Sequence, residues 1–343
     1  MNNAVSWSEM LTFMECQRKW QLRYQLGIEP VSGDDVLARF LGSAFHAGIS
    51  KFIVTGNVDV AIDAAKEYID ENTRTAEGQS DYYDMINEAH NAVWTMLSYY
   101  LPRLEIGTKY RPVQVGEIFP DAPDAYNYMV EWSFYTHDDK PIKGAIDAIL
   151  YDLETEEYVL VDWKTRSSFP FEDAAHLDGQ LHLYIAALKS MTDAPLNRAI
   201  MWQFKVRTPQ PASISKVSGL PNTGAASYDT TWEQWCKTLP AGIKAERFEA
   251  LMKPKLKTDD EFMRKTELII TPMSVERTKR TTQGIISAMD FARERLDSGD
   301  FLPAVQSVHT CKMCPFFRLC GGVLRYGGNF EEALALNYKQ KET

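Results

Sequence analysis

A chain of 343 residues, 45% of them hydrophobic, is long enough to bury the core of one large domain or two small ones. Its net charge of −10 argues against a protein that coats nucleic acid through bulk positive charge, although a local basic groove can lie on an acidic body. No segment approaches the ~20 apolar residues that cross a bilayer, and the first residues, MNNAVSWSEM, lack the pattern of a secretory signal, so we expect a cytoplasmic protein without membrane contacts.

The first hundred residues are predicted to be helical. Residues 6–26 carry an imperfect apolar stripe that begins near Ser8, which can act as an N-cap. Apolar residues at helical spacing predict three further helices, at residues 37–54, 58–73 and 81–104.

The pattern changes near residue 112, where β-branched and aromatic residues alternate with polar ones between turn signals. Four strands are predicted, the last three of which form an antiparallel meander: residues 113–119, 128–136, 144–152 and 158–165. A helix at 173–190 and a strand at 198–206 follow. This order of elements predicts an α/β core with additional helices on both sides in sequence.

The last third of the chain is less regular. Residues 208–230 are rich in Pro, Gly, Ser and Thr, which indicates a loop or an inserted linker. Helices are predicted at 231–252 and 273–298. Residues 301–328 combine little periodicity with a cluster of cysteines.

The sharpest local signal is a pair of aspartates and a lysine at the ends of neighbouring predicted strands. Asp147 and Asp162 both follow apolar residues, in GAID and VLVD, so they emerge near the sheet core, where a charge is costly unless it is paired or binds a cation. Two close carboxylates favour Mg²⁺ or Mn²⁺, which prefer oxygen ligands. Lys164, on the same strand face as Asp162, could orient or deprotonate a water and stabilise a developing phosphorane charge. The alternative is a solvated ion pair at the strand ends.

The same residues carry a resemblance to a known family. GAID followed by VDWKT resembles motifs II and III of the PD-(D/E)xK nuclease superfamily, in its RecB-type branch. Upstream, residues 42–46 (GSAFH) resemble the G-x-x-x-H helix motif of that branch. Downstream, residues 180–184 (QLHLY) resemble its Q-x-x-x-Y motif, whose two side chains share one face of a helix.

The resemblance implies a restriction-endonuclease-like core, which is a central mixed sheet flanked by helices. It implies a metal-dependent nuclease, and most directly an exonuclease, that acts on single-stranded DNA or DNA ends in recombination, repair or replication. A helicase or a recombination protein is the partner that this role suggests.

The site residues that the resemblance implies fall into two groups. The implied ligands of Mg²⁺ or Mn²⁺ are His46, Asp147, Asp162 and the backbone carbonyl of Trp163. Lys164 would act on the attacking water, while Gln180 and Tyr184 would position the DNA strand. Family members often add a glutamate from the first strands, and both Glu117 and Glu131 fit that description.

A second strong signal is the spacing of three cysteines, Cys311-x2-Cys314-x5-Cys320, which can bring three thiolates onto one metal. The fourth ligand would be Cys16, near the chain start, or His309. Cys236 lies between aromatic residues and is expected to be a free structural thiol.

From the spacing alone, zinc and an iron–sulfur cluster are equally compatible with these thiolates. One N-terminal cysteine followed by a C-terminal C-x2-C-x5-C resembles the iron–sulfur nucleases of the AddB type and the RecB-related nucleases of CRISPR adaptation. That resemblance implies a 4Fe-4S cluster that joins the two ends of the chain as a staple, held by Cys16, Cys311, Cys314 and Cys320.

Several basic residues are candidates for contacts to nucleic acid. Arg18, Lys19 and Arg23 alternate with Trp20 and Tyr24, a pattern that suits a single strand but is also typical of a solvated helix face. Further candidates for a DNA groove are Arg166, Lys205 and Arg207. A short basic run is more typical of a solvated surface: Lys253, Lys255 and Lys257.

The domain interpretation is a single nuclease domain built from three parts. Residues 42–207 form the catalytic core, residues 1–41 with 300–325 form the staple, and residues 208–299 form a loop and helical insertion that resembles that of phage-encoded members. Two other functions stay open: a non-catalytic DNA-end-binding protein of the same fold, and a zinc-stapled interaction protein.

Overall fold

The computed structural model describes most of the chain. The described residues are 4–30, 36–73, 82–224, 228–298, 302–303, 308–312, 314–323, 334 and 338–340. None of the helices in these ranges is long and apolar enough to cross a membrane.

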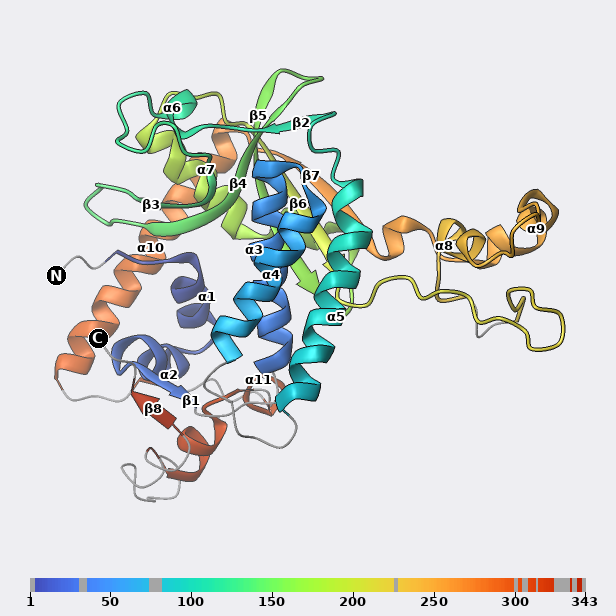
Figure 1. The fold of residues 1–343 in the computed structure, drawn as a ribbon. Coiled ribbons are helices and arrows are strands. Elements are labelled where there is room, and N and C mark those ends of the chain that lie inside the picture. Colours follow the sequence, from blue (N-terminus) through green and yellow to red (C-terminus); the bar gives the residue numbers. More distant parts are fainter. Residues whose placement is uncertain are drawn as a thin grey trace.

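A mixed, curled sheet lies at the centre of the molecule (Figure 1). Its main path runs in the order β2-β4-β5-β6-β7, and β3 pairs with β4 beside this path. The bounds of the strands are Tyr110–Pro112 (β2), Val130–Tyr135 (β3), Lys143–Asp152 (β4), Glu157–Arg166 (β5), Arg198–Lys205 (β6) and Met263–Ile269 (β7). Strands β3, β4 and β5 form the expected antiparallel meander, and β5 and β6 are parallel.

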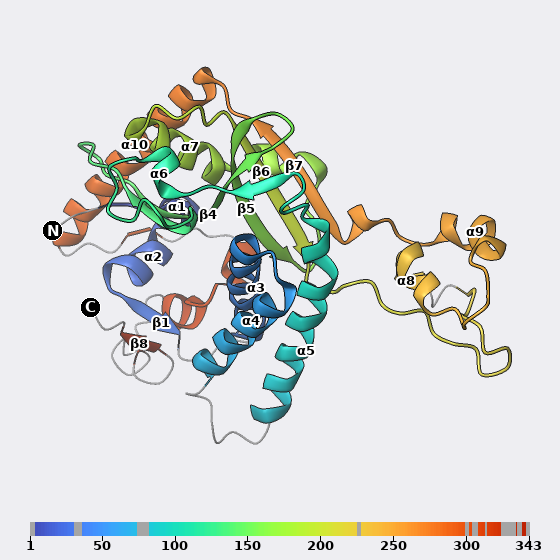
Figure 2. The same cartoon turned by 45° about the horizontal axis from the view of Figure 1, so that its top comes forward.

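Helices cover both faces of the sheet (Figure 2). On one face lie α7 (Gly179–Met191) and α10 (Pro272–Asp297), with α1 (Trp7–Glu15) against α10. Their apolar side chains form one core cluster with the sheet, which includes Leu181 of α7, Met289 of α10 and Leu160 of β5. Helix α7 also makes the crossover that two parallel strands require.

The opposite face is covered by α3 (Val36–Thr55), α4 (Val58–Thr73) and α5 (Tyr82–Tyr100), followed by a 3₁₀ turn at Leu101–Arg103. Phe45 and Leu97 from these helices share a second core cluster with Val161 and Phe204 of the sheet. The expected architecture, a mixed sheet flanked by helices, is therefore confirmed.

The alternation of side chains reverses in the middle of the β3–β4 hairpin. Val130 belongs to the core cluster of one sheet face and Trp132 packs against the other, although residues two apart on a strand normally share a face. The residue between them, Glu131, has φ = +50°, in the left-handed region that non-glycine residues rarely occupy. Strand β4 reverses in the same way across Asp147, so both carboxylates lie where the hairpin bends.

The N-terminal segment is broken rather than one helix over 6–26. Helix α1 ends because Cys16 is extended, with φ = −162°, and its N-cap is Ser6, not the expected Ser8. Helix α2 (Gln17–Trp20), a π-helical turn (Gln21–Gln25) and β1 (Ile28–Pro30) follow. Strand β1 pairs with β8 (Tyr338–Gln340), which brings the two ends of the chain together.

The cysteine-rich segment is described in part. Helix α11 (Val308–Lys312) and a π-helical turn (Arg318–Val323) carry Cys311 and Cys320. Residues 301, 304–307, 313 and 324–328 of the predicted 301–328 segment lie outside the described residues, as does the side chain of His309.

Residues 208–224 and 228–261, here called the wing, project from the body of the molecule (Figures 1 and 2). The wing contains α8 (Trp232–Lys237), α9 (Glu246–Met252) and two 3₁₀ turns (Lys253–Lys255 and Asp259–Glu261) around a small apolar cluster of its own. The continuous helix expected at 231–252 was wrong, because Pro240 and Gly242, with φ = +86°, separate α8 from α9.

Two other expectations differ from the structure. Residues 113–119 were expected to be a strand but contain the short helix α6 (Val115–Ile118), which begins with a capping box between Gln114 and Glu117. Strand β7 was not predicted, yet it pairs with β6 along its whole length.

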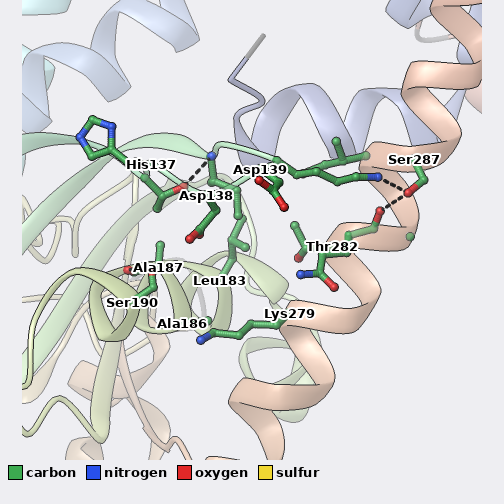
Figure 3. A pocket seen from close by; sticks show the side chains of 16 residues that line it. His137, Asp138, Asp139, Leu183, Ala186, Ala187, Ser190, Lys279, Thr282 and Ser287 are labelled. Carbon is green, nitrogen blue, oxygen red and sulfur yellow. Dashed lines mark hydrogen bonds between the residues drawn. The ribbon is translucent and has the colours of Figure 1, made fainter. Parts of the chain in front are cut away.

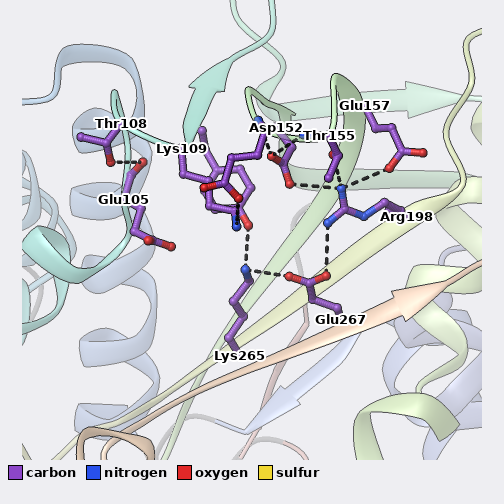
Figure 4. A network of polar contacts seen from close by, with 11 residues as sticks. Glu105, Thr108, Lys109, Asp152, Thr155, Glu157, Arg198, Lys265 and Glu267 are labelled. Atoms are coloured by element: carbon purple, nitrogen blue, oxygen red, sulfur yellow. Dashed lines mark hydrogen bonds and ion pairs between the residues drawn. The ribbon is translucent and has the colours of Figure 1, made fainter.

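A polar network ties the sheet together at one end (Figure 4). Arg198 of β6 pairs with the fully buried Asp152 of β4 at 3.1 Å and with Glu267 of β7 at 3.1 Å. Lys265 links Glu267, at 2.7 Å, to the hydroxyl of Tyr110 on β2, at 2.6 Å. These contacts connect strands that are far apart in the sequence.

Candidate active site

The two aspartates of the predicted site lie on neighbouring strands at the point where the strands separate. The pairing of β4 with β5 ends at Ala148 and Val161. Beyond this point, the backbone N–H of Trp163 donates to the side-chain Oδ2 of Asp147 at 2.8 Å instead of to the backbone of β4. The separation leaves room between the strands for side chains from both.

Lys164, Asp162 and Gln180 form a closed hydrogen-bonded group. Lys164 Nζ donates to Asp162 Oδ1 at 2.8 Å and to Gln180 Oε1 at 3.1 Å. Gln180 Nε2 donates to the same Asp162 oxygen at 3.1 Å. Gln180 occupies this place because Asp178 caps α7 by accepting the Gln180 backbone N–H at 2.8 Å, which starts the helix beside β5.

His46 reaches the site from the opposite helical layer. Its Nδ1 lies 3.9 Å from Asp147 Oδ1 and 3.8 Å from Glu131 Oε1. Donor atoms of these three residues lie within 4.8 Å of one another, the one such group of three or more His, Cys, Asp or Glu donors among the described residues. Ser50, one turn after His46, donates to Glu131 at 3.0 Å and so helps to fix that carboxylate.

Gly42 explains why α3 can approach the sheet so closely. A Cβ atom at this position would lie 3.0 Å from the side-chain oxygen of Thr165 on β5. His46 is one helical turn further along the same face of α3, and its ring stacks edge-on against Trp163, with 5.8 Å between the ring centres. The predicted G-x-x-x-H motif is thus a contact between a helix and a strand.

Burial dominates the electrostatics of the two aspartates. Burial raises the pKa of Asp147 well above its ordinary value, and the nearby charge of Asp162 raises it further. Burial also raises the pKa of Asp162, because it outweighs the attraction of Lys164. Two neighbouring carboxyl groups whose pKa values are both raised indicate a place that a bound cation would stabilise.

The two basic groups of the site shift in opposite directions. Burial and the charge of Lys164 lower the pKa of His46 to about 4, so its ring is neutral near pH 7 and offers a free nitrogen. Burial opposes the charge of Lys164, but Asp162 and Asp147 outweigh burial and raise the pKa of its ammonium group.

The residues present fit a divalent cation of the kind that the sequence predicted. Asp162 Oδ2 is buried and has no hydrogen-bond partner among the described residues. Buried polar atoms normally have a partner, and a cation would be one for this oxygen. Carboxylate oxygens suit Mg²⁺ and Mn²⁺, and the neutral imidazole of His46 adds one nitrogen donor to them. The donors that could hold the ion are His46, Glu131, Asp147 and Asp162.

Of the two candidate glutamates, Glu131 is at this site and Glu117 is not. Glu117 accepts two hydrogen bonds from Arg111, at 3.0 and 2.8 Å, and caps α6. Alternating strand patterns suggest both residues equally, and the positive φ that aims Glu131 at His46 leaves no signal in the sequence.

Tyr184 lies beneath the site rather than at its surface. Its side chain is 7% exposed, packs edge-on against Phe134 with 5.3 Å between ring centres, and bonds Gln180. The spacing of the Q-x-x-x-Y motif therefore lets the tyrosine support the glutamine. Contact between Tyr184 and a DNA strand stays a prediction.

The four cysteines of the predicted staple lie in one region without forming a closed site. Burial raises the pKa of Cys314, and the nearby thiols of Cys16 and Cys320 raise it further. No three of these sulfurs lie within 4.8 Å of one another. The geometry alone therefore does not show a metal staple.

Most of the other predicted DNA contacts are used within the protein. Trp20 is fully buried against Phe13, so the expected stacking of a base on Trp20 is wrong. Arg18 donates to the carbonyl of Leu302 at 2.7 Å, and Lys19 pairs with Glu15 at 2.7 Å. In the wing, two cations are paired with acidic neighbours, namely Lys253 with Glu249 and Lys257 with Asp229.

A pocket of about 700 Å³ lies apart from this site, between the β3–β4 turn, α7 and α10 (Figure 3). Asp138 and Asp139 from the turn face Lys279 of α10 across it. It contains none of the carboxylate–lysine group, and no set of metal donors lies in it among the described residues. We assign it no role.

A mixed sheet between two helical layers, with buried carboxylates, an ammonium group and a neutral imidazole where two strands separate, defines an α/β protein with a candidate divalent-metal centre. The sequence model of the PD-(D/E)XK nuclease superfamily matches residues 4–321. The chain belongs to this superfamily, whose members are typically metal-dependent nucleases. No curated protein matches the chain.

Proposed function

We propose that this protein is a metal-dependent deoxyribonuclease that hydrolyses phosphodiester bonds with Mg²⁺ or Mn²⁺. The observation that carries the proposal is the pair of buried carboxylates, Asp147 and Asp162, whose pKa values are raised beside the ammonium group of Lys164. A non-catalytic DNA-binding protein has no need of these buried charges, which destabilise the fold when no cation is bound between them.

The residues have distinct roles in this proposal. His46, Glu131 and Asp147 would hold the cation, and the Oδ2 of Asp162, which has no partner among the described residues, and the carbonyl of Trp163 would complete its ligands. Gln180 fixes the position of Lys164, whose ammonium group orients the attacking water and stabilises negative charge as it develops on the phosphate. A bound cation supplies Lewis acidity and lowers the pKa of a bound water.

The finer proposal is an exonuclease of the RecB-type branch that acts on single-stranded DNA or DNA ends. The G-x-x-x-H and Q-x-x-x-Y motifs support it, because both are features of that branch and both lie at the site here. A role in recombination, repair or replication follows, with a helicase or recombination protein as partner and the cytoplasm as location. The inserted wing is consistent with a phage-encoded origin.

We also propose that Cys16, Cys311, Cys314 and Cys320 hold a 4Fe-4S cluster. The support for this proposal is the sequence pattern of one N-terminal cysteine and a C-terminal C-x2-C-x5-C, which resembles that of the iron–sulfur nucleases. The mutual effects of these cysteines on pKa are consistent with one shared region.

The test of the proposed function is hydrolysis of labelled DNA with Mn²⁺. The purified protein should shorten linear single strands, and Lys164→Ala should reduce the rate by at least about 100-fold, the scale seen for loss of one preorganised stabilising group. Lys189→Ala is the matched control, because Lys189 lies on α7 and donates to the exposed Asn197 instead. A circular strand of the same sequence separates exonuclease from endonuclease action.

Two results would contradict the proposal. Equal activity of the wild-type protein and Lys164→Ala would point to a contaminating nuclease. DNA binding without hydrolysis under any divalent metal would favour the non-catalytic end-binding protein.

A further inference from the structure

The loop that joins β5 to α7, residues 167–178, is anchored at both ends beside the candidate active site. Arg166 precedes the loop at the end of β5, and Asp178 closes it as the N-cap of α7. Asp178 accepts the backbone N–H of Gln180 at 2.8 Å, and the side chain of Gln180 donates to Asp162 at 3.1 Å. Arg166 lies two residues beyond Lys164 on the same strand. The loop therefore lies along the rim of the site.

This loop is held in place while it exposes apolar side chains. Ala175 is 3% exposed and belongs to the core, and the carbonyl of Pro170 accepts a hydrogen bond from Arg264 at 3.0 Å. Between and beyond these anchors, Phe171 is 65% exposed and Leu177 is 76% exposed. A single exposed apolar residue is ordinary, but a phenylalanine fixed on the rim of a phosphodiesterase site is in a position to meet a substrate.

Positive charge surrounds the same loop on a protein that is acidic as a whole. Lys205 and Arg264 lie over the ring of Phe169, with 5.4 and 4.9 Å to the ring centre. The Nε of Arg166 is buried and has no hydrogen-bond partner in the described part of the chain.

We infer that Phe171 is a stacking platform for an unpaired base of the DNA strand that enters the site, while Arg166, Lys205 and Arg264 meet its phosphates. Cations that follow the backbone and an aromatic ring that stacks on a base are the combination that binds single strands. Phe171 is five residues after Arg166, and five residues of chain reach at most about 18 Å. Phe171 would therefore meet a base within a few nucleotides of the scissile bond. The inference rests on the proposed function and adds that unpaired ends are preferred over blunt duplexes.

The test compares a normal oligonucleotide with one that keeps its phosphates but lacks bases. Fluorescence anisotropy without divalent metal would measure the binding of single-stranded DNA to the full-length Lys164→Ala protein, whose cleavage is expected to be slow. The DNA would be used with and without abasic sites at its terminal nucleotides. Adding Phe171→Ala should weaken binding to the normal strand by about tenfold, and Phe171→Trp should restore it. On the abasic strand, the three proteins should bind alike.

The matched control is Phe291→Ala, because Phe291 is 63% exposed, much as Phe171 is, but belongs to α10 and not to the loop. It should bind both strands as the parent protein does. An equal loss on normal and abasic strands, or no loss with Phe171→Ala, would overturn the inference.

Cleavage by the protein with Lys164 intact separates this inference from the proposed function. If that protein cuts DNA and Phe171→Ala binds unchanged, only the stacking role fails. If it cuts no DNA with any divalent metal, the proposed function fails, while the binding comparison still decides whether Phe171 meets a base.

Discussion

Asp147 and Asp162 are held where an ionised carboxylate is costly. Asp162 is 2% exposed and keeps one oxygen without a partner among the described residues, and Asp147 relies on a single backbone N–H. Burial of charge without full compensation destabilises a fold, and such arrangements persist mainly where function requires them. Glu131 adds strain of its own through its left-handed backbone, which typically costs about 1–3 kcal/mol.

One substitution at this site should therefore have opposite effects on stability with and without metal. Asp147→Asn should raise the free energy of unfolding in EDTA by about 1 kcal/mol, because it removes the repulsion between the two carboxylates. The wild-type protein should gain about 3 kcal/mol when Mn²⁺ is present at 100 times its dissociation constant, and the variant should lose most of that gain. Urea unfolding with and without Mn²⁺ measures both effects.

Glu117→Gln is the control for this experiment, since Glu117 pairs with Arg111 away from the site. It should leave the gain from Mn²⁺ unchanged. An equal gain in the wild-type protein and Asp147→Asn would mean that the ion binds elsewhere.

At the scale of elements, strong periodicity predicted most of the fold. The long helices α3, α4, α5 and α10 and the strands β3 to β6 agree with their predicted ranges to within a few residues. Strand β7 was missed because it lies at the edge of the sheet. Its sequence, MRKTELI, carries charged residues that pair along the edge, such as Lys265 with Glu267, instead of an apolar alternation.

Residues 113–119 show how a local bond overrides a strand-like pattern. Val113, Val115 and Ile118 are buried as the pattern suggests. However, Glu117 caps the backbone of Gln114 at 2.9 Å, which closes a helical turn. Whether residues 113–119 form a strand or a helical turn depends on the neighbouring chain, here the hydrogen bond from the backbone N–H of Gly116 to the carbonyl of Ala125. The pattern of apolar residues does not reveal this contact.

Close contacts between elements make two glycines a test of packing. A Cβ at Gly144 on β4 would lie 2.9 Å from the rings of Phe134 and Tyr184, so Gly144→Ala should destabilise the protein by about 1–3 kcal/mol. It should also lower activity, because Tyr184 supports Gln180. Gly284 lies within α10 with open space around it, so Gly284→Ala should stabilise by up to about 1 kcal/mol. Thermal unfolding of both variants measures the difference, and equal effects would contradict the packing described.

The polar network in Figure 4 predicts how stability depends on pH. Burial raises the pKa of Asp152, but two backbone N–H groups and Arg198 outweigh burial and hold it below its ordinary value. A carboxyl whose pKa is lowered by folding stabilises the folded state above about pH 4, and this contribution is lost as the pH falls through the lower value.

Arg198→Met should therefore cost about 3 kcal/mol at pH 7, because it leaves a buried carboxylate unpaired. The loss should shrink as the pH falls below about 4. Lys253→Met, which removes an exposed pair with Glu249, should cost no more than about 0.5 kcal/mol at any pH. Urea unfolding at several pH values checks this, and a loss that is constant with pH would rule out the assigned role of Asp152.

At the scale of the molecule, the two ends of the chain meet on one side. Strand β1 pairs with β8, and Arg18 bonds the carbonyl of Leu302, across nearly the whole sequence. Closing such a long loop costs conformational entropy, which a metal cluster between the ends would help to overcome.

Cys314→Ala should therefore lower the melting temperature and the solubility of the protein and remove most of its bound iron. Cys236→Ala is the matched control, because Cys236 lies in the wing and packs against its small apolar cluster. It should leave the iron content unchanged. Stoichiometric zinc without iron, or unchanged melting of Cys314→Ala with full activity, would contradict the proposed cluster.

The site itself was predictable where its residues belong to ordered motifs. His46, Asp147, Lys164 and Gln180 are far apart in sequence, yet four short motifs in order indicated them, and the structure brings them together. The place of Glu131 was not predictable, because it depends on a bend of the β3–β4 hairpin that only the packing of both sheet faces creates.

The central claim is that one divalent cation binds between α3, β4 and β5. The most direct measurement is anomalous diffraction from a crystal of the protein soaked in Mn²⁺. We predict a strong anomalous peak within coordination distance of His46, Asp147 and Asp162. A crystal that diffracts well and shows Mn²⁺ only at other positions, or none at saturating concentration, would contradict the account.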